Sequence, residues 1–280
     1  MEKIVQRSSV EALAALMRGR RTLALSGAGI STESGIPDYR GPDGVLRARH
    51  PMQYREFVGS EEARRRYWSR SAVGWARLTQ ALPNPGHAAL ARLEGAGVVI
   101  GIITQNVDGL HQAAGSRRVL ELHGSLAEVR CLTCGRTETR VHFRDRLLGG
   151  NPGWEPAQAA AAPDGDAELA AAERGLVTIP ACVHCGGVMK PDVVFFGENV
   201  PGRRVEEAWS MLSDAEMLLV VGSSLAVFSG FRFVERAARD GKPVAIVNQG
   251  LTRGDDLAAV RIEGRLGDVL PRLAESLAVL

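Results

Sequence analysis

Four cysteines stand in two short pairs, Cys131 with Cys134 and Cys182 with Cys185, and a glycine directly follows each pair. A C-x-x-C turn brings two thiolates to one point, so two such turns supply the four sulfur ligands of a tetrahedral zinc site. Disulfide bonds are one alternative, but they need an oxidising compartment, and a redox-active pair would not require the motif twice. We therefore predict one structural zinc ion, which leaves no thiol to act as a nucleophile.

Polar clusters follow several apolar runs of the sequence. The glycines after Ser26 permit a tight turn and close approach to a phosphate, although the G-x-G-x-x-G fingerprint is incomplete because Thr32 takes its sixth position. A single histidine after an apolar strand is more often a structural group, but several polar clusters at one sheet edge favour a shared cleft with His123 as general base. The clusters are 26–31, 105–108, 123–124 and 222–224.

The residues after Gly35 form another unusual stretch, because Gly35 and Pro37 stand too close together for a helix to begin there. The sequence from Thr32 to Gly41 predicts a long loop, and long loops in compact domains are usually functional. The simpler alternative is a surface turn with a solvated Asp38 and Arg40.

Buried parallel strands must position these clusters. Short apolar runs that end in small or polar residues predict such strands, and helical stretches separate many of them. Ser8 or Ser9 is the expected N-cap of a first helix that ends near Gly19. We expect an α/β fold with an open, mostly parallel sheet covered on both faces, which binds ligands at the carboxyl ends of its strands. The expected strands are 22–26, 98–104, 119–122, 217–221 and 244–248, and the expected helices include 85–94, 205–212 and 231–239.

Composition narrows the class of protein further. The 280 residues carry a formal net charge of +2, from 34 basic and 32 acidic side chains, which gives no general attraction to nucleic acid. No apolar run reaches the roughly 20 residues of a membrane helix, and charged residues interrupt the N-terminus where a secretory segment would lie. The Ala- and Pro-rich stretch at 151–174 predicts a surface excursion.

These properties predict a soluble protein, of one large domain or of a large domain that carries a smaller one, with no nucleic-acid or membrane partner. We expect it in the cytoplasm, or in the mitochondrial matrix if the source is eukaryotic. The sequence leaves the oligomeric state open, a monomer included.

Taken in order, the motifs resemble the sirtuins, the NAD-dependent protein-lysine deacylases, over about residues 25 to 270. Tyr39 and the sequence Asn151-Pro152-Gly153-Trp154 are similar to class II of that family. The matching stretches are 27–31, 35–40, 105–108, 123–124, both cysteine pairs, 191–198, 222–224 and Asn248.

The resemblance implies a Rossmann-like, mostly parallel sheet with an inserted small domain, made of a helical segment and the four-cysteine zinc module. The large domain would comprise about 1–36, 87–126 and 191–280. The small domain would comprise about 37–86 and 127–190.

The resemblance also implies an NAD site formed by four parts of the chain. The first glycine turn and the following loop would wrap the dinucleotide, the stretch at 105–108 would hold nicotinamide and its ribose, and Asp108 would accept the carboxamide N–H. The residues at 222–224 would contact phosphate, and those near Asn248 would line the adenosine site. The full set is Gly27, Ala28, Gly29, Ser31, Thr32, Ile36, Pro37, Asp38, Tyr39, Arg40, Arg47, Gln105, Asn106, Val107, Asp108, Gly222, Ser223, Ser224, Asn248, Gln249, Gly250 and Leu266.

The implied reaction consumes NAD. Nicotinamide leaves the ribose, the acyl-lysine oxygen attacks the sugar, and the acyl group passes to ADP-ribose, which releases free lysine and O-acyl-ADP-ribose. His123 would be the proton acceptor, with Asn106 and Asp108 as further catalytic residues, and an imidazole with a reference pKa of about 6.5 suits that role. The partners would be proteins that carry acyl-lysine.

A substrate peptide would add by backbone pairing to a strand-like rail formed by Val194, Phe196 and Gly197.

The identity of the acyl group is a separate question. Tyr67 and Arg70 match in spacing the Tyr-x-x-Arg pair with which desuccinylating sirtuins hold an acyl carboxylate, and side chains three residues apart on a helix can reach one anion. A solvated basic helix face is the alternative, and removal of lipoyl or biotinyl groups is also open.

Two other functions use the same residues. The NAD pocket could pass ADP-ribose to a protein side chain, as in a mono-ADP-ribosyltransferase. A non-catalytic, nucleotide-sensing module is the third hypothesis, although a complete set of base, nicotinamide and phosphate residues argues against it.

Overall fold

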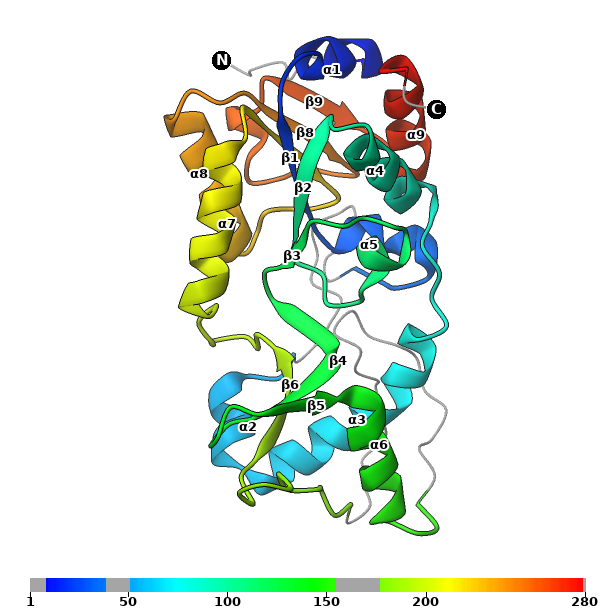
Figure 1. Cartoon of the computed structure of the whole chain (residues 1–280), viewed down its shortest axis with the longest axis vertical. Coiled ribbons are helices and arrows are strands. Elements are labelled where there is room, and N and C mark those ends of the chain that lie inside the picture. The colour runs from blue at the N-terminus through cyan, green and yellow to red at the C-terminus, as the bar shows by residue number, and fades with distance from the viewer. Residues whose placement is uncertain (1–8, 39–50, 155–176, 279–280) are drawn as a thin grey trace.

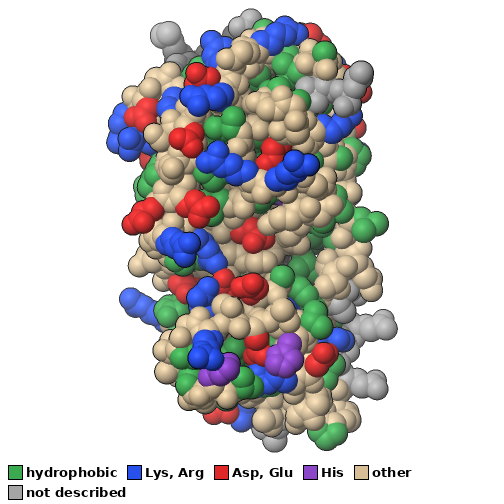
Figure 2. Space-filling view, viewed as in Figure 1, with side chains coloured by type: hydrophobic (Ala, Val, Ile, Leu, Met, Phe, Trp, Pro, Cys, Tyr) green, Lys and Arg blue, Asp and Glu red, His purple; other side chains and the backbone are tan. Residues whose placement is uncertain are grey.

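The computed structural model describes residues 9–38, 51–154 and 177–278. These residues form a large lobe, drawn at the top of Figure 1, and a small lobe below it. In the face drawn in Figure 2, basic and acidic side chains are interspersed, as a near-zero net charge leads one to expect. No helix in the described ranges is long and apolar enough to cross a membrane.

The large lobe is built on a six-stranded sheet in the order β3-β2-β1-β7-β8-β9, and every neighbouring pair is parallel. The α/β prediction is therefore confirmed, and the sheet has one strand more than the five expected. Because all six strands run the same way, their carboxyl ends meet at one edge. The strands are β1 (Thr22–Ser26), β2 (Val99–Thr104), β3 (Val119–Glu121), β7 (Met217–Val221), β8 (Val244–Asn248) and β9 (Val260–Glu263).

Alternation along each strand divides the apolar residues between two helical layers. In β1, Ala24 packs into a core with α1 (Val10–Met17), α4 (Pro85–Gly95) and α9 (Leu266–Ser276). Leu23 and Leu25 point to the opposite face and pack with α7 (Gly202–Asp214) and α8 (Phe228–Arg239). Figure 1 shows the two layers on either side of the sheet.

Local signals explain the helix starts. The Ser9 hydroxyl accepts a hydrogen bond from the Ala12 amide, so Ser9 is the N-cap of α1. The Asn84 side chain caps α4 with Pro85 in the first turn, which fits the fixed φ of proline.

The small lobe contains a three-stranded antiparallel sheet in the order β5-β4-β6. Its core is aromatic: Trp68 and Phe143 have ring centroids 4.3 Å apart, and the buried Arg140 guanidinium lies 4.8 Å from the Trp68 ring. β4 and β6 run across the expected domain limits at 126/127 and 190/191. The elements are β4 (Gly124–Cys131), β5 (Thr137–Thr139), β6 (Met189–Val193), α2 (Tyr54–Gly59), α3 (Glu61–Leu78) and α6 (Arg140–Gly149).

Short helical turns connect strand ends to the rest of the large lobe. They are the 3₁₀ turns η1 (Ala28–Ile30), η2 (Thr32–Ser34) and η4 (Asp255–Leu257), and the single-turn helix α5 (Leu110–Ala113). Two 3₁₀ turns follow β1, and no α-helix begins in the described residues 27–38. The sequence likewise predicts that no helix begins there.

Candidate active site

His123 lies between the end of β3 and the start of β4, where the two lobes join. Its Nδ1 is 3.0 Å from the Gln105 carbonyl oxygen, and its Nε2 is 2.8 Å from the Ser229 hydroxyl. A carbonyl oxygen only accepts, so Nδ1 carries the proton and Nε2 holds the lone pair. The ring is therefore held as the tautomer that a general base at Nε2 requires.

The surroundings of His123 keep the ring uncharged. Burial lowers its pKa to about 4, the Gln105 carbonyl acts in the opposite direction, and the positive charges of Arg232 and Arg204 lower the pKa further. At neutral pH the imidazole is thus uncharged, the state that a proton acceptor requires. A perturbed histidine in a junction between two lobes is a reasonable candidate for catalysis.

A hydrogen-bonded triad lies at the ends of β1 and β2. The Ser31 hydroxyl donates to Asp108 Oδ2 at 2.7 Å and accepts from Asn106 Nδ2 at 3.0 Å. Asp108 Oδ1 accepts from the Leu110 amide at 3.0 Å, at the start of α5. Three residues predicted from two separate motifs are therefore held by one another.

Three glycines bring two strand-end turns into contact. A Cβ at Gly27 would lie 2.8 Å from the Ser223 Cβ, and one at Gly29 would lie 2.9 Å from the Gly222 carbonyl oxygen. A Cβ at Gly222 would lie 2.5 Å from the Ile30 amide nitrogen. Turns without side chains suit close approach of the backbone to a pyrophosphate. The residues present therefore fit a dinucleotide at this sheet edge.

Further contacts join the predicted nicotinamide, phosphate and adenosine segments. Gln105 Nε2 donates to the Ser223 hydroxyl at 2.8 Å, and a Cβ at Gly222 would lie 2.7 Å from the Leu266 side chain. Glu33, in η2, accepts from the Gly267 amide at 2.6 Å, which fixes the turn against the first turn of α9. Asn248 Nδ2 donates to the carbonyl oxygens of the next two residues, Gln249 and Gly250.

The loop after β1 is described only in part. Ile36 is buried, Thr32 donates to the Gly29 carbonyl at 2.9 Å, and Pro37 and Asp38 are half-buried. Ala28 lies in η1, Val107 packs against the core of the small lobe, and Ser224 accepts the Arg253 amide through its carbonyl. The predicted NAD contacts Tyr39, Arg40 and Arg47 lie outside the described residues.

A small cavity of about 60 Å³ adjoins Asp108, between the carboxyl end of α3 and the start of β4. Its walls are mostly apolar, with Trp75, Leu78 and Val107 among the lining residues. The carboxylate of the triad therefore has an apolar space beside it.

The predicted peptide rail follows β6. The Val194 amide donates to the carbonyl oxygen of His123 at 2.8 Å, and the Phe196 carbonyl oxygen accepts from the Tyr54 amide at 2.9 Å. Gly197 follows with φ +77°, a conformation that favours glycine. The rail is thus bonded to the backbone of the candidate base at one end and to α2 at the other.

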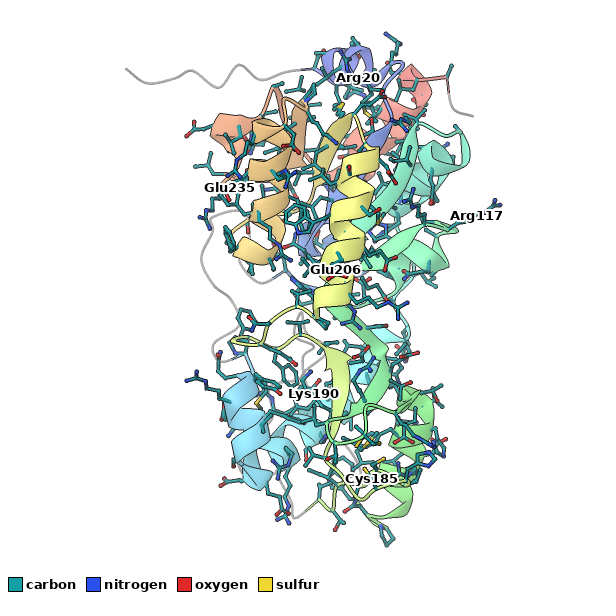
Figure 3. All side chains as sticks on the ribbon, turned by 60° about the vertical axis from the view of Figure 1, so that its left-hand side comes forward. Arg20, Arg117, Cys185, Lys190, Glu206 and Glu235 are labelled. Atoms are coloured by element: carbon teal, nitrogen blue, oxygen red, sulfur yellow. The ribbon has the colours of Figure 1, made fainter. Side chains whose placement is uncertain are left out.

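A buried ion pair braces the same segment. Lys190 Nζ lies 3.0 Å from a Glu198 carboxylate oxygen, and it also donates to the Val193 carbonyl. Glu198 accepts the Phe195 amide at 2.8 Å. In Figure 3 Lys190 is labelled in the small lobe, on the β6 strand.

The four cysteines converge as predicted. All four Sγ atoms lie within 4.8 Å of one another, with Cys131 and Cys185 Sγ atoms 3.5 Å apart and those of Cys134 and Cys182 3.7 Å apart. Zn–S bonds of about 2.3 Å in a tetrahedron place the sulfurs roughly 3.8 Å apart, so the cluster fits zinc. Figure 3 shows Cys185 in the small lobe, below Lys190 in that view.

Tyr67 and Arg70 both lie on α3, in different environments. Tyr67 is 1% exposed, and its ring packs against Phe57 and Phe195 with centroids 5.6 and 5.1 Å apart. Arg70 is half-buried. The Tyr67 ring thus belongs to the core beneath the rail and is no part of a solvated face, and the acyl-carboxylate role of the pair stays a prediction.

Sequence reasoning missed a buried polar network under the triad. His111 Nε2 lies 2.8 Å from the Ser26 hydroxyl, which donates to Thr104 Oγ1 at 2.8 Å, and Thr104 Oγ1 accepts the Asn106 amide at 3.1 Å. The His87 ring packs edge-on to His111 at 5.0 Å. A polar residue at the end of a buried strand, as Ser26 and Thr104 are, was the available signal.

Ser229 was missed as well, although its hydroxyl meets His123 Nε2. It lies 106 positions from His123 in an ordinary helix start, and no spacing rule relates the two.

The chain is similar to known proteins over nearly its whole length. The model of the Sir2 family matches residues 27–229. A Streptomyces coelicolor protein named NAD-dependent protein deacetylase 1 is 53% identical over 263 residues, which cover 94% of this chain and 88% of that protein. A Mycobacterium avium protein of the same name is 50% identical over 281 residues, 99% of this chain and 98% of that protein.

Solved structures show the same likeness. One described as Sir2–p53 peptide–NAD+ has a TM-score of 0.79 at 31% identity and covers 98% of this chain and 100% of that chain. Another, described as Sir2 bound to acetylated peptide, has a TM-score of 0.74 at 29% identity with the same coverage. Both lobes are therefore shared with these structures.

Proposed function

This chain belongs to the Sir2 family and is an NAD-dependent protein deacetylase, and from that premise we propose how its residues perform the reaction. The observation that carries the mechanism is the fixed tautomer of His123: Nδ1 donates to the Gln105 carbonyl and leaves the lone pair on Nε2, while the backbone carbonyl of the same residue accepts from Val194 at the start of the rail. His123 is the proton acceptor, because burial leaves its ring neutral at physiological pH.

NAD supplies the ribosyl group that receives the acyl oxygen, and nicotinamide is its leaving group. The glycine turns at Gly27 and Gly222 take the pyrophosphate, and a side chain at either position would collide with the facing turn and push the two turns apart. Asn106 and Asp108 hold the nicotinamide end, and their hydrogen bonds to Ser31 fix both side chains before substrate arrives.

The substrate is a protein with an acylated lysine. Its backbone pairs with the rail at Val194 to Gly197, which gives affinity with little demand on sequence. Because the Val194 amide is bonded to the His123 carbonyl, pairing on the rail places the lysine side chain next to the base. The zinc site has no part in this chemistry, since four sulfurs close its coordination shell.

The experiment is a peptide assay with acetyl-lysine substrate and NAD, in which nicotinamide and deacetylated peptide are measured together. We expect equal amounts of the two products from the wild type and no turnover from His123→Ala. As a matched control, His142→Ala changes an exposed histidine of the small lobe and should leave turnover unchanged. Nicotinamide release with ADP-ribose incorporated into protein, and no free lysine formed, would instead identify a mono-ADP-ribosyltransferase.

A further inference from the structure

The first turns of α8 contact the proposed base, and no predicted site residue comes from this helix. Ser229, the second residue of α8, places its hydroxyl 2.8 Å from His123 Nε2. Nε2 has no proton in the tautomer that Gln105 imposes, so the Ser229 hydroxyl donates this bond. The amino end of α8 therefore provides the hydrogen bond to the Nε2 lone pair, the same lone pair that accepts the proton in the proposed reaction.

Close packing holds this turn in place. A Cβ at Gly230 would lie 2.5 Å from Gln105 Oε1, so the helix approaches the end of β2 as closely as a glycine allows. Arg232 Nε donates to the Ser229 carbonyl oxygen at 3.1 Å. The same arginine thus fixes the residue whose hydroxyl meets the base.

The Arg232 guanidinium is a cation with aromatic neighbours. Its Cζ lies 5.2 Å from the Phe233 ring centroid and 5.6 Å from that of Trp209, and its buried Nη2 atom has no hydrogen-bond partner in the described residues. No carboxylate in the described ranges forms an ion pair with it, whereas Arg236, one turn later, pairs with Asp240 at 2.8 Å. Among the described residues, Arg232 therefore carries a positive charge that no carboxylate pairs with.

The other groups around His123 do not replace that charge. From α7, Arg204 also faces His123, but its guanidinium pairs with Asp192 at 2.6 Å. From β2 the neighbour is the Gln105 carbonyl, and from β3 Glu121 is a carboxyl whose pKa burial raises. Positive charge from α8 beside a buried imidazole opposes its protonation.

We propose that Arg232 is a positioning residue for His123: it secures the Ser229 turn against Nε2 and supplies a positive charge, unpaired among the described residues, on the helix turn that contacts the ring. The inference rests on the proposed role of His123 as base, and it adds a residue outside the nicotinamide, phosphate and peptide segments. Arg232 touches neither substrate nor nicotinamide in this assignment, and it acts through the base.

The test compares Arg232→Met, which keeps an apolar stem over the rings, with Arg232→Lys, which keeps the charge. Arg232→Gln serves as a second uncharged variant should Met disturb folding, and Arg236→Met is the control on the same helix. Two quantities are measured: the acidic limb of log kcat/KM against pH, and the His123 imidazole titration by NMR in the protein without substrate.

We expect both readouts to move to higher pH by about half to one unit in Arg232→Met and Arg232→Gln. Arg232→Lys should restore the wild-type position, and Arg236→Met should not move it. An unchanged His123 titration in both uncharged variants overturns the proposal, as does a shift of equal size in Arg232→Lys. A wild type that releases no nicotinamide would refute the proposed function, and the NMR titration would still decide the effect of Arg232 on His123.

Discussion

Gly124 is the position where the structure predicts the largest effect of one added methyl group. Its φ is +84°, and a Cβ there would lie 1.8 Å from the Asp192 carbonyl oxygen of the neighbouring antiparallel strand β6. An ordinary contact begins near 3.4 Å, so β4 and β6 must separate by 3.4 − 1.8 = 1.6 Å. The backbone conformation costs an alanine about 1–2 kcal/mol and the overlap about 1–3 kcal/mol.

Gly124→Ala also strains the adjacent hydrogen bond between the Val194 amide and the His123 carbonyl, which is worth about 1 kcal/mol. We therefore expect the free energy of unfolding to fall by about 3–6 kcal/mol in Gly124→Ala. Gly97→Ala is the matched control, because Gly97 has φ +74° with nothing within 4 Å of its Cβ position. That variant should lose only the conformational part, about 1–2 kcal/mol.

Urea unfolding of both variants measures this difference, and the peptide assay measures its effect on turnover. Gly124→Ala should also lose most of its kcat, since separation of the strands moves the rail and the base apart. Equal destabilisation of the two variants, or full turnover in a destabilised Gly124→Ala, would refute the predicted separation of β4 from β6.

Three further predictions concern pH, zinc and acyl choice. Burial lowers the pKa of His87 and His123 to about 4 and the pKa of His111 to about 3. In the unfolded chain the same imidazoles bind their protons near pH 6.5, so the free energy of unfolding should fall as pH drops from 6.5 towards 4. Between pH 7 and pH 5 each of these histidines should lower the free energy of unfolding by roughly 2 kcal/mol. Urea unfolding of His111→Gln should therefore show a smaller loss of stability over this pH range than the wild type, and an equal loss would contradict the assignment. Elemental analysis should find one zinc per chain. Cys182→Ser or a chelator should destabilise the small lobe by several kcal/mol, and an unfolding curve that does not change when zinc is removed would exclude a structural role. On an acyl-peptide panel, Arg70→Ala should selectively slow succinyl and glutaryl removal, and equal rates for all acyl groups would exclude the carboxylate clamp.

The sequence predicted those parts of the fold that local patterns specify. The apolar runs at β1, β7 and β8 are buried at every position, so composition alone marks them as central strands. The cysteine spacing likewise predicted a cluster whose sulfurs do converge. Both signals depend on residues a few positions apart.

Other features depend on contacts that no local pattern encodes. β9, with Arg261 in its middle, is too short and polar to show as an apolar run. α3 carries three consecutive arginines and still buries Tyr67 and Trp68 in the small lobe, because tertiary packing outweighs its low hydropathy. The Ser229 contact with His123 joins residues 106 positions apart, so only the folded chain brings them together.

The hydrogen bond from Val194 to the carbonyl of His123 has a consequence for how new substrate preferences can arise. The proposed peptide rail and the proposed base share one backbone hydrogen bond, so a shift of one would strain the position of the other. Substitutions that change specificity without moving the base would then lie at side chains of the rail, such as the partly exposed Phe196, and in the helices packed behind it. New target preferences can arise by substitution at these positions without a change in the geometry of proton transfer.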